Sequence, residues 1–196
     1  MVFHTSRSAR AHTGKCAVRS LTPERRACRR HAVAGAIDDA LRANEEYARD
    51  FGHGDLGAKP QRKLAVVTCM DCRLEPLRFL GLEPGDAHVI ANAGGRARDA
   101  LRSLVVSQQM LGTEEVAVVH HTECGMGAYT NDAIRERVRE GTGADPADLD
   151  FLAFGDLEQS VREDVAFLRD SPLIPDSVTI RGFVYDVKSG RVSEVA

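Results

Sequence analysis

Two short stretches of this chain combine side chains that bind soft metal ions with side chains that could act on a bound molecule. The first is Cys69-Met70-Asp71-Cys72-Arg73, and the second is His120-His121-Thr122-Glu123-Cys124-Gly125. Thiolate and imidazole are ligands that zinc selects. The spacing His121-x-x-Cys124 lets one turn present both groups to one ion, whereas Cys69 comes from a separate segment. We predict a zinc site with Cys69, His121 and Cys124 as its ligands.

Three protein ligands leave one position of a tetrahedral zinc open, which is typical of a catalytic rather than a structural site. Asp71 follows Cys69 by two residues and could reach that position, and Arg73 could hold the Asp71 carboxylate in a bidentate pair. We therefore predict that Asp71 and Arg73 form a catalytic pair. Two states of Asp71 remain open. Paired with Arg73, it accepts a hydrogen bond from a zinc-bound hydroxide; released from Arg73, it ligates the zinc and blocks water.

Each polar stretch follows a short, β-branched apolar run, Leu64–Val67 for the first and Val116–Val119 for the second. Unalternated runs of this kind are typical of strands that are covered on both faces. In open α/β sheets, functional sites lie outside the carboxyl ends of the strands. We therefore expect two adjacent parallel strands to deliver the three ligands to one edge of a sheet.

The remaining pattern alternates helices with strands. Strands are expected over residues 63–68, 87–91, 116–119 and 177–187, and helices over 33–49, 74–80 and 98–111, with two more capped by Thr130 (ending at Gly141) and by Asp156. A turn at Ser189-Gly190 leads into a last, antiparallel strand. This order predicts a three-layer α/β/α fold with a mainly parallel central sheet and an antiparallel C-terminal edge strand. The paired glycines Gly94-Gly95 would let the backbone approach the site.

Composition and charge limit the partners. The 196 residues suffice for one good core, and no apolar run approaches the length of a membrane span. Residues 1–31 carry eight basic residues and one acidic residue, whereas the rest of the chain is acidic. We expect a basic, disordered N-terminal tail over residues 1–31, in preference to an organelle transit peptide, and one zinc domain over residues 32–196. An acidic domain argues against nucleic acid, and we expect no membrane partner.

The cysteines favour a reducing compartment. Their odd number and the absence of a secretory signal argue against a disulfide framework, so we expect a cytoplasmic protein; the five are Cys16, Cys28, Cys69, Cys72 and Cys124. A second zinc site at Cys28-Arg29-Arg30-His31 is disfavoured, because no strand or turn pattern frames it.

Three separated motifs together resemble the β-class carbonic anhydrases, and most closely their compact prokaryotic and archaeal branch. They are Cys-Met-Asp-x-Arg from Cys69, Asn-Ala-Gly-Gly from Asn92, and His-Thr-Glu-Cys-Gly-Met from His121. The segment Gly182-Phe183-Val184-Tyr185-Asp186 is also similar, and the resemblance runs from about Val33 to the C-terminus.

The resemblance implies a zinc lyase that interconverts CO2 and bicarbonate. It assigns Cys69, His121 and Cys124 as zinc ligands and Asp71 with Arg73 as the catalytic pair. It also implies a homodimer or higher homo-oligomer with the site near a subunit interface. Cys72 stands where Ser or Ala is common, and Glu123 where Asp is common. Neither change removes a ligand.

Other functions remain as alternatives. An enzyme that hydrolyses carbon disulfide or carbonyl sulfide would use the same zinc site, because access-controlling segments rather than ligands decide the substrate. A non-catalytic zinc or redox-sensing protein is disfavoured by the presence of Asp71 and Arg73. Cys69-x-x-Cys72 alone would suit a redox pair or half a zinc ribbon, but a ribbon needs a second such pair, which is absent. His120 lacks the offset to Cys124 and is expected to be structural.

Overall fold

The computed structural model describes residues 35–196. The tail expected over residues 1–31, and the segment around Cys28 with it, therefore lie outside the described residues. The chain divides into a unit that ends at Phe51 and a second unit over Gly52–Ala196. In the described part, no helix combines the length and the apolar character that crossing a membrane requires.

The first unit holds helix α1 (Ala36–Tyr47) and the single turn η1 (Ala48–Asp50). The Asp38 carboxylate accepts a hydrogen bond from Gly35 N (3.1 Å) at the start of α1. The apolar side chains of Ile37 and Leu41 are 77% and 62% exposed among the described residues. Of the helix predicted over residues 33–49, the structure shows Ala36–Tyr47 as an α-helix, and its apolar side chains are exposed.

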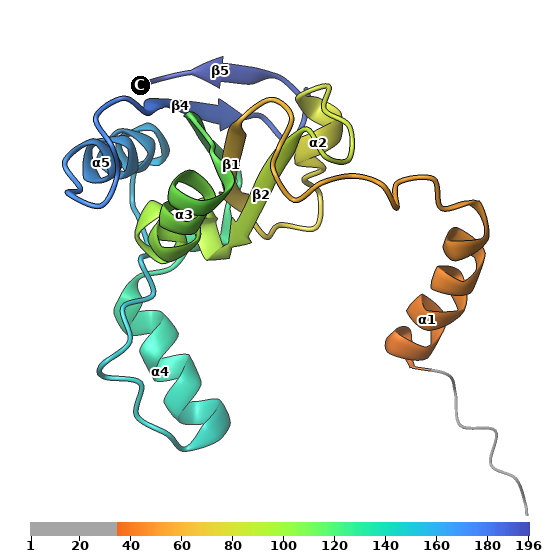
Figure 1. Cartoon of the computed structure of the whole chain (residues 1–196). Coiled ribbons are helices and arrows are strands. Elements are labelled where there is room, and N and C mark those ends of the chain that lie inside the picture. The colour runs from red at the N-terminus through yellow and green to blue at the C-terminus, as the bar shows by residue number, and fades with distance from the viewer. Residues whose placement is uncertain (1–34) are drawn as a thin grey trace, which may run out of the picture. The chain divides into compact units, whose positions relative to one another are not determined.

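The second unit is built on a five-stranded sheet with the order β2-β1-β3-β4-β5 (Figure 1). Its strands are β1 (Leu64–Cys69), β2 (Ala87–Asn92), β3 (Glu115–His121), β4 (Thr179–Tyr185) and β5 (Val192–Glu194). The first four strands are parallel, and β5 runs antiparallel to β4. The predicted α/β class, with its mainly parallel sheet and antiparallel C-terminal edge strand, is confirmed.

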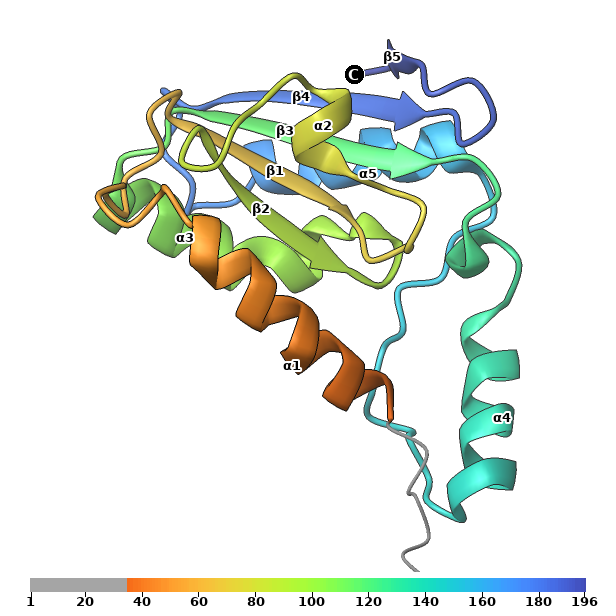
Figure 2. The same cartoon turned by 90° about the vertical axis from the view of Figure 1, so that its right-hand side faces the viewer.

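Helices cover both faces of this sheet (Figure 2). Helices α3 (Ala97–Leu111) and α5 (Leu157–Arg169) lie on one face, where they pack on Ala65 and Val67 of β1. The short helix α2 (Pro76–Phe79) lies on the other face, where Val66 packs with Leu82. Because consecutive residues of β1 point into opposite apolar layers, the strand has no polar alternation.

Among the helix boundaries that differ from the prediction, those of α4 and α2 have a local physical reason. Helix α4 (Asn131–Thr142) passes through Gly141. It ends at Gly143, which has a φ of +74° and whose N–H donates a hydrogen bond to Arg139 O. Helix α2 begins at Pro76 rather than at residue 74, because proline disfavours helical geometry at the preceding Glu75, which has φ −120° and ψ 77°. The predicted caps are present: Thr130 accepts from Ala133 N, and Asp156 accepts from Gln159 N.

The strands that precede the two polar stretches are longer at their carboxyl ends than predicted. Strand β1 includes Cys69, and strand β3 includes His121. Both residues are therefore held by strand hydrogen bonding rather than by a free loop.

Candidate metal centre

The three predicted ligands converge at the carboxyl edge of the sheet. Cys69 ends β1, His121 ends the neighbouring β3, and Cys124 lies in the turn that follows. Their ligand atoms all lie within 4.8 Å of one another, and the two Sγ atoms are 3.9 Å apart. Two sulfurs bound to one tetrahedral zinc at about 2.3 Å would be about 3.8 Å apart. The observed spacing therefore fits a single metal ion.

His121 is oriented for a metal ion. Its ring is fully buried, and Nδ1 donates a hydrogen bond to Thr122 O (2.9 Å). Nε2 is buried and has no hydrogen-bond partner among the described residues. A buried nitrogen without a partner is costly. A metal ion would use the Nε2 lone pair, and the bond at Nδ1 fixes the ring for it.

The two thiols influence each other strongly. The hydrogen bond with Cys124 lowers the pKa of Cys69, and backbone hydrogen bonds from Gly94 and Asp71 add to this effect. The same contact with Cys69, together with burial, raises the pKa of Cys124. One thiolate is thus favoured, while a second negative charge beside it is opposed. A divalent cation would remove that opposition.

Asp71 and Arg73 form the predicted bidentate pair. Asp71 Oδ1 accepts from Arg73 Nε (2.9 Å) and from Arg73 N (2.9 Å), and Oδ2 accepts from Nη2 (2.7 Å). These bonds hold the pKa of the Asp71 carboxyl well below its usual range. Asp71 Oδ2 lies 3.8 Å from His121 Nε2. The structure therefore has Asp71 in its Arg73-paired state, with the carboxylate beside the ligands.

Arg73 also joins the two polar stretches. Its Nη2 donates to Glu123 O (3.2 Å), and its Nη1 donates to Glu123 Oε2 (3.4 Å). Lys188 Nζ holds the other Glu123 oxygen at 2.5 Å. Glu123 has a φ of +57°, which is uncommon for a residue other than glycine. The residue with this uncommon backbone geometry is thus the one whose carbonyl oxygen accepts the hydrogen bond from the Arg73 guanidinium.

The paired glycines approach the site as predicted. Gly94 and Gly95 have φ values of +81° and +70°. A Cβ atom on Gly95 would lie 3.0 Å from both Cys69 N and the Thr68 carbonyl carbon. The turn after β2 therefore packs directly on the last peptide of β1.

A hollow of about 270 Å³ adjoins the candidate ligands. Its walls include His121 and Cys124 together with the apolar side chains of Phe154 and Leu157. The sequence predicted Leu157 only as an apolar position of the helix capped by Asp156, and it predicted no site role for Phe154, because neither residue has a ligand-type side chain or follows a strand. The hollow offers a small molecule a partly apolar place beside the candidate ligands, with Glu123 also in its wall.

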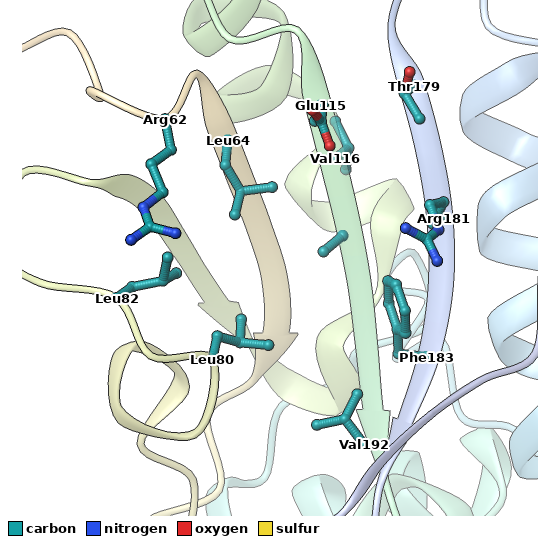
Figure 3. Close-up of a pocket in the computed structure, with 11 residues that line it drawn as sticks. Arg62, Leu64, Leu80, Leu82, Glu115, Val116, Thr179, Arg181, Phe183 and Val192 are labelled. Carbon is teal, nitrogen blue, oxygen red and sulfur yellow. The ribbon is translucent and has the colours of Figure 1, made fainter.

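A second hollow, of about 260 Å³, lies over the face of the sheet that α2 covers (Figure 3). Leu64, Glu115 and Thr179, the first residues of β1, β3 and β4, line it. Its two arginines are already paired, Arg62 with Asp86 and Arg181 with Glu194. None of the residues that line this hollow is a candidate ligand.

Comparison with known proteins gives one consistent family. A family model described as carbonic anhydrase matches residues 64–192. Beta-carbonic anhydrase 1 of Mycobacterium tuberculosis is 39% identical over 159 residues, which cover 81% of this chain and 96% of that protein. A carbon disulfide hydrolase of Acidianus sp. is 33% identical over 184 residues, covering 82% of this chain and 89% of that protein.

A solved structure has a similar arrangement. The carbonic anhydrase from Streptococcus mutans superimposes with a TM-score of 0.80 and is 48% identical in sequence. The match covers 84% of this chain and 99% of that one. The similarity thus includes both the fold and the sequence that carries the candidate centre.

Proposed function

This chain belongs to the β-class carbonic anhydrases, and from that premise we propose that it is a zinc lyase that interconverts CO2 and bicarbonate. The observation that carries the proposal is the convergence of Cys69, His121 and Cys124 within 4.8 Å. The Asp71–Arg73 pair beside them supplies the polar groups that such a reaction needs.

The donor set supports zinc as the metal. Two thiolates and one imidazole suit a borderline-soft ion in tetrahedral geometry, and hard ions such as Mg2+ prefer oxygen. When bound, zinc supplies Lewis acidity that lowers the pKa of water, so that hydroxide is available near neutral pH. Two thiolates offset more of the zinc charge than neutral ligands do, so we expect the activity to rise towards alkaline pH.

Asp71 acts as a fixed acceptor. Its ionised carboxylate only accepts hydrogen bonds, and the two parallel bonds from Arg73 set the plane of the carboxylate. Because its pKa is held low, Asp71 orients the nucleophile by accepting a hydrogen bond and does not take up the proton.

The hollow beside the centre suits the substrate. CO2 is small and carries no hydrogen-bond donor, so apolar walls such as Phe154 and Leu157 favour it over water. Bicarbonate is charged and is retained less well between such walls, which favours its release.

Three substrates assayed on one preparation test the proposal. CO2 hydration is followed by stopped flow, and carbon disulfide and carbonyl sulfide hydrolysis by sulfide release, with zinc quantified per chain. We expect CO2 turnover, reduced about 100-fold or more by Asp71→Asn because the acceptor charge is lost. Asp99→Asn is the matched control, since Asp99 is exposed on α3 and its carboxylate makes no hydrogen bond or ion pair within the described chain. Its activity should stay within about twofold of wild type.

The alternative is hydrolysis of carbon disulfide or carbonyl sulfide on the same centre. The similarity to the Acidianus carbon disulfide hydrolase is the reason for assaying these two substrates as well. Sulfide release without CO2 hydration would establish that alternative. One zinc per chain without turnover of any of the three substrates would instead indicate a non-catalytic zinc or redox-sensing protein.

We also propose a homodimer or higher homo-oligomer in the cytoplasm. Apolar side chains are exposed at the β2 edge of the sheet, where Val89 of β2 and Val106 of the adjoining helix α3 are 38% and 48% exposed among the described residues. An exposed edge strand with such neighbours suits a second copy. Sedimentation of wild type and of Val106→Lys tests this surface: we expect the substitution to dissociate the oligomer. Equal masses, or a monomeric wild type, would contradict it.

Free thiols at Cys69, Cys72 and Cys124 suit a reducing compartment, which cell fractionation would test.

A further inference from the structure

A buried charged cluster lies outside the candidate ligand set. Arg96, His120 and Asp164 are 7%, 0% and 1% exposed among the described residues. Asp164, on α5, forms an ion pair with Arg96 Nη2 (3.0 Å) and accepts a hydrogen bond from Ala97 N (2.9 Å) at the start of α3. Buried ionic groups are weak evidence for stability, and fixing a conformation is one alternative role.

His120 connects this cluster to the metal centre. Its Nε2 lies 3.2 Å from Asp164 Oδ2 and 3.2 Å from Gly95 O, and its Nδ1 lies 2.8 Å from Ser160 Oγ. Both ring nitrogens are thereby engaged, and the ring stacks on Phe154. Because His120 directly precedes His121, this buried ring fixes the end of β3.

The cluster also holds the glycine turn against Cys69. Asn92 closes the turn, since its Oδ1 accepts from Arg96 N (2.7 Å) and its Nδ2 donates to Arg96 O (2.9 Å). Gly95 lies against Cys69 N, as shown by the 3.0 Å that would separate an added Cβ from it. The backbone of Gly94 forms a hydrogen bond with the Cys69 thiol group. The turn is thus clamped by the cluster on one side and touches a candidate ligand on the other.

We propose that Asp164 is a positioning residue of the metal centre, which through Arg96 and His120 fixes the glycine turn that places the Cys69 sulfur. This proposal rests on the proposed metal site at Cys69, His121 and Cys124. Asp164 touches neither the ligand atoms nor the hollow, so its effect reaches the metal through the backbone of Gly94 and Gly95. It presets the Cys69 position before the metal binds.

Loss of the Asp164 contacts with Arg96 and His120 should lower the affinity for metal, and not only the free energy of unfolding. Removing groups that orient metal ligands lowers metal affinity roughly 10- to 100-fold. We expect Asp164→Asn to raise the zinc dissociation constant by about that factor. We also expect a shift in the thiolate-to-metal and d–d absorption bands of the cobalt-substituted protein, because the Cys69 sulfur is repositioned.

The test uses the full chain, with zinc affinity measured by chelator competition and cobalt spectra recorded at saturation. Val165→Ala is the control: Val165 is a buried core residue next to Asp164 on α5, and it takes no part in the cluster's hydrogen bonds. It should lower stability while leaving both metal readouts unchanged. Ser160→Ala is a milder second variant, because it removes one partner of His120, and we expect a smaller loss of affinity, roughly 2- to 10-fold.

Unchanged affinity and spectra in Asp164→Asn, or equal changes in Val165→Ala, would overturn the proposal. If Asp164→Asn does not fold, Ser160→Ala decides by the same two readouts. The outcome is separable from the proposed function. A metal-loaded wild type without CO2 turnover would refute the enzyme assignment and leave the positioning role intact. Unchanged metal affinity in the variants would refute the positioning role and leave the enzyme assignment intact.

Discussion

Replacing Gly95 by alanine would press a methyl group against the backbone of the first candidate ligand. Gly95 has a φ of +70°, where a residue with a Cβ atom pays about 1–2 kcal/mol. The new carbon would lie 3.0 Å from Cys69 N and from the Thr68 carbonyl carbon. Both are backbone atoms that cannot rotate away, and overpacking of this kind costs about 1–3 kcal/mol.

Together these effects predict a loss of about 2–5 kcal/mol in the free energy of unfolding, and a displaced Cys69. Gly81→Ala is the matched control, because Gly81 has a φ of +64° but its Cβ would meet no described atom within 4 Å. It should lose only the backbone part, about 1–2 kcal/mol.

Urea unfolding and zinc content per chain measure the difference. We expect Gly95→Ala to lose more stability than Gly81→Ala and to retain less zinc at the same free zinc concentration. Equal losses of stability with full zinc retention in both variants would refute the tight approach of the glycine turn to Cys69.

Three further predictions follow from other contacts. Arg73→Ala should let the pKa of Asp71, now held well below its usual range, rise towards about 3.9. The carboxylate then stays ionised above about pH 5. The loss of kcat/KM should therefore be constant from about pH 6 to 9 and become larger only at lower pH. A loss of kcat/KM that vanishes at alkaline pH would contradict this. Gly182→Ala would place its Cβ 2.5 Å from Val161 Cγ1; we expect a loss of about 1–3 kcal/mol by urea unfolding, partly relieved in a Val161→Ala background, and a fully additive double variant would oppose it. Removing zinc with a chelator should abolish CO2 hydration and lower the Tm, since a ligand at about 100 times its Kd stabilises by about 2.7 kcal/mol; an unchanged Tm would count against metal at this centre.

The strand ends and the ligand types were predictable from local sequence. The apolar runs before Cys69 and His121 indicate buried parallel strands, and neighbouring parallel strands bring their carboxyl ends together. The paired glycines also carried a local signal, because positive φ values with close backbone contact require glycine. These features depend on residues that are close in the chain or on one pairing of strands.

The clamp on the glycine turn could not be predicted in this way. Arg96, His120 and Asp164 come from three segments, and only the packing of α5 against α3 and the sheet brings them together. The end of α4 depends on which of two nearby glycines takes the left-handed conformation, and Gly143 does so. One domain over residues 32–196 remains a prediction, since the chain divides after Phe51.

The central claim is that the metal at Cys69, His121 and Cys124 is the catalytic centre. It is tested most directly by titrating zinc into metal-free protein and following CO2 hydration by stopped flow at about pH 8.5, a mildly alkaline pH that favours deprotonation of the attacking water. We predict that turnover rises in proportion to zinc, reaches a plateau at about one zinc per chain, and is absent in Cys124→Ser. Turnover in metal-free protein, or one bound zinc per chain without turnover at that pH and above, would contradict the account.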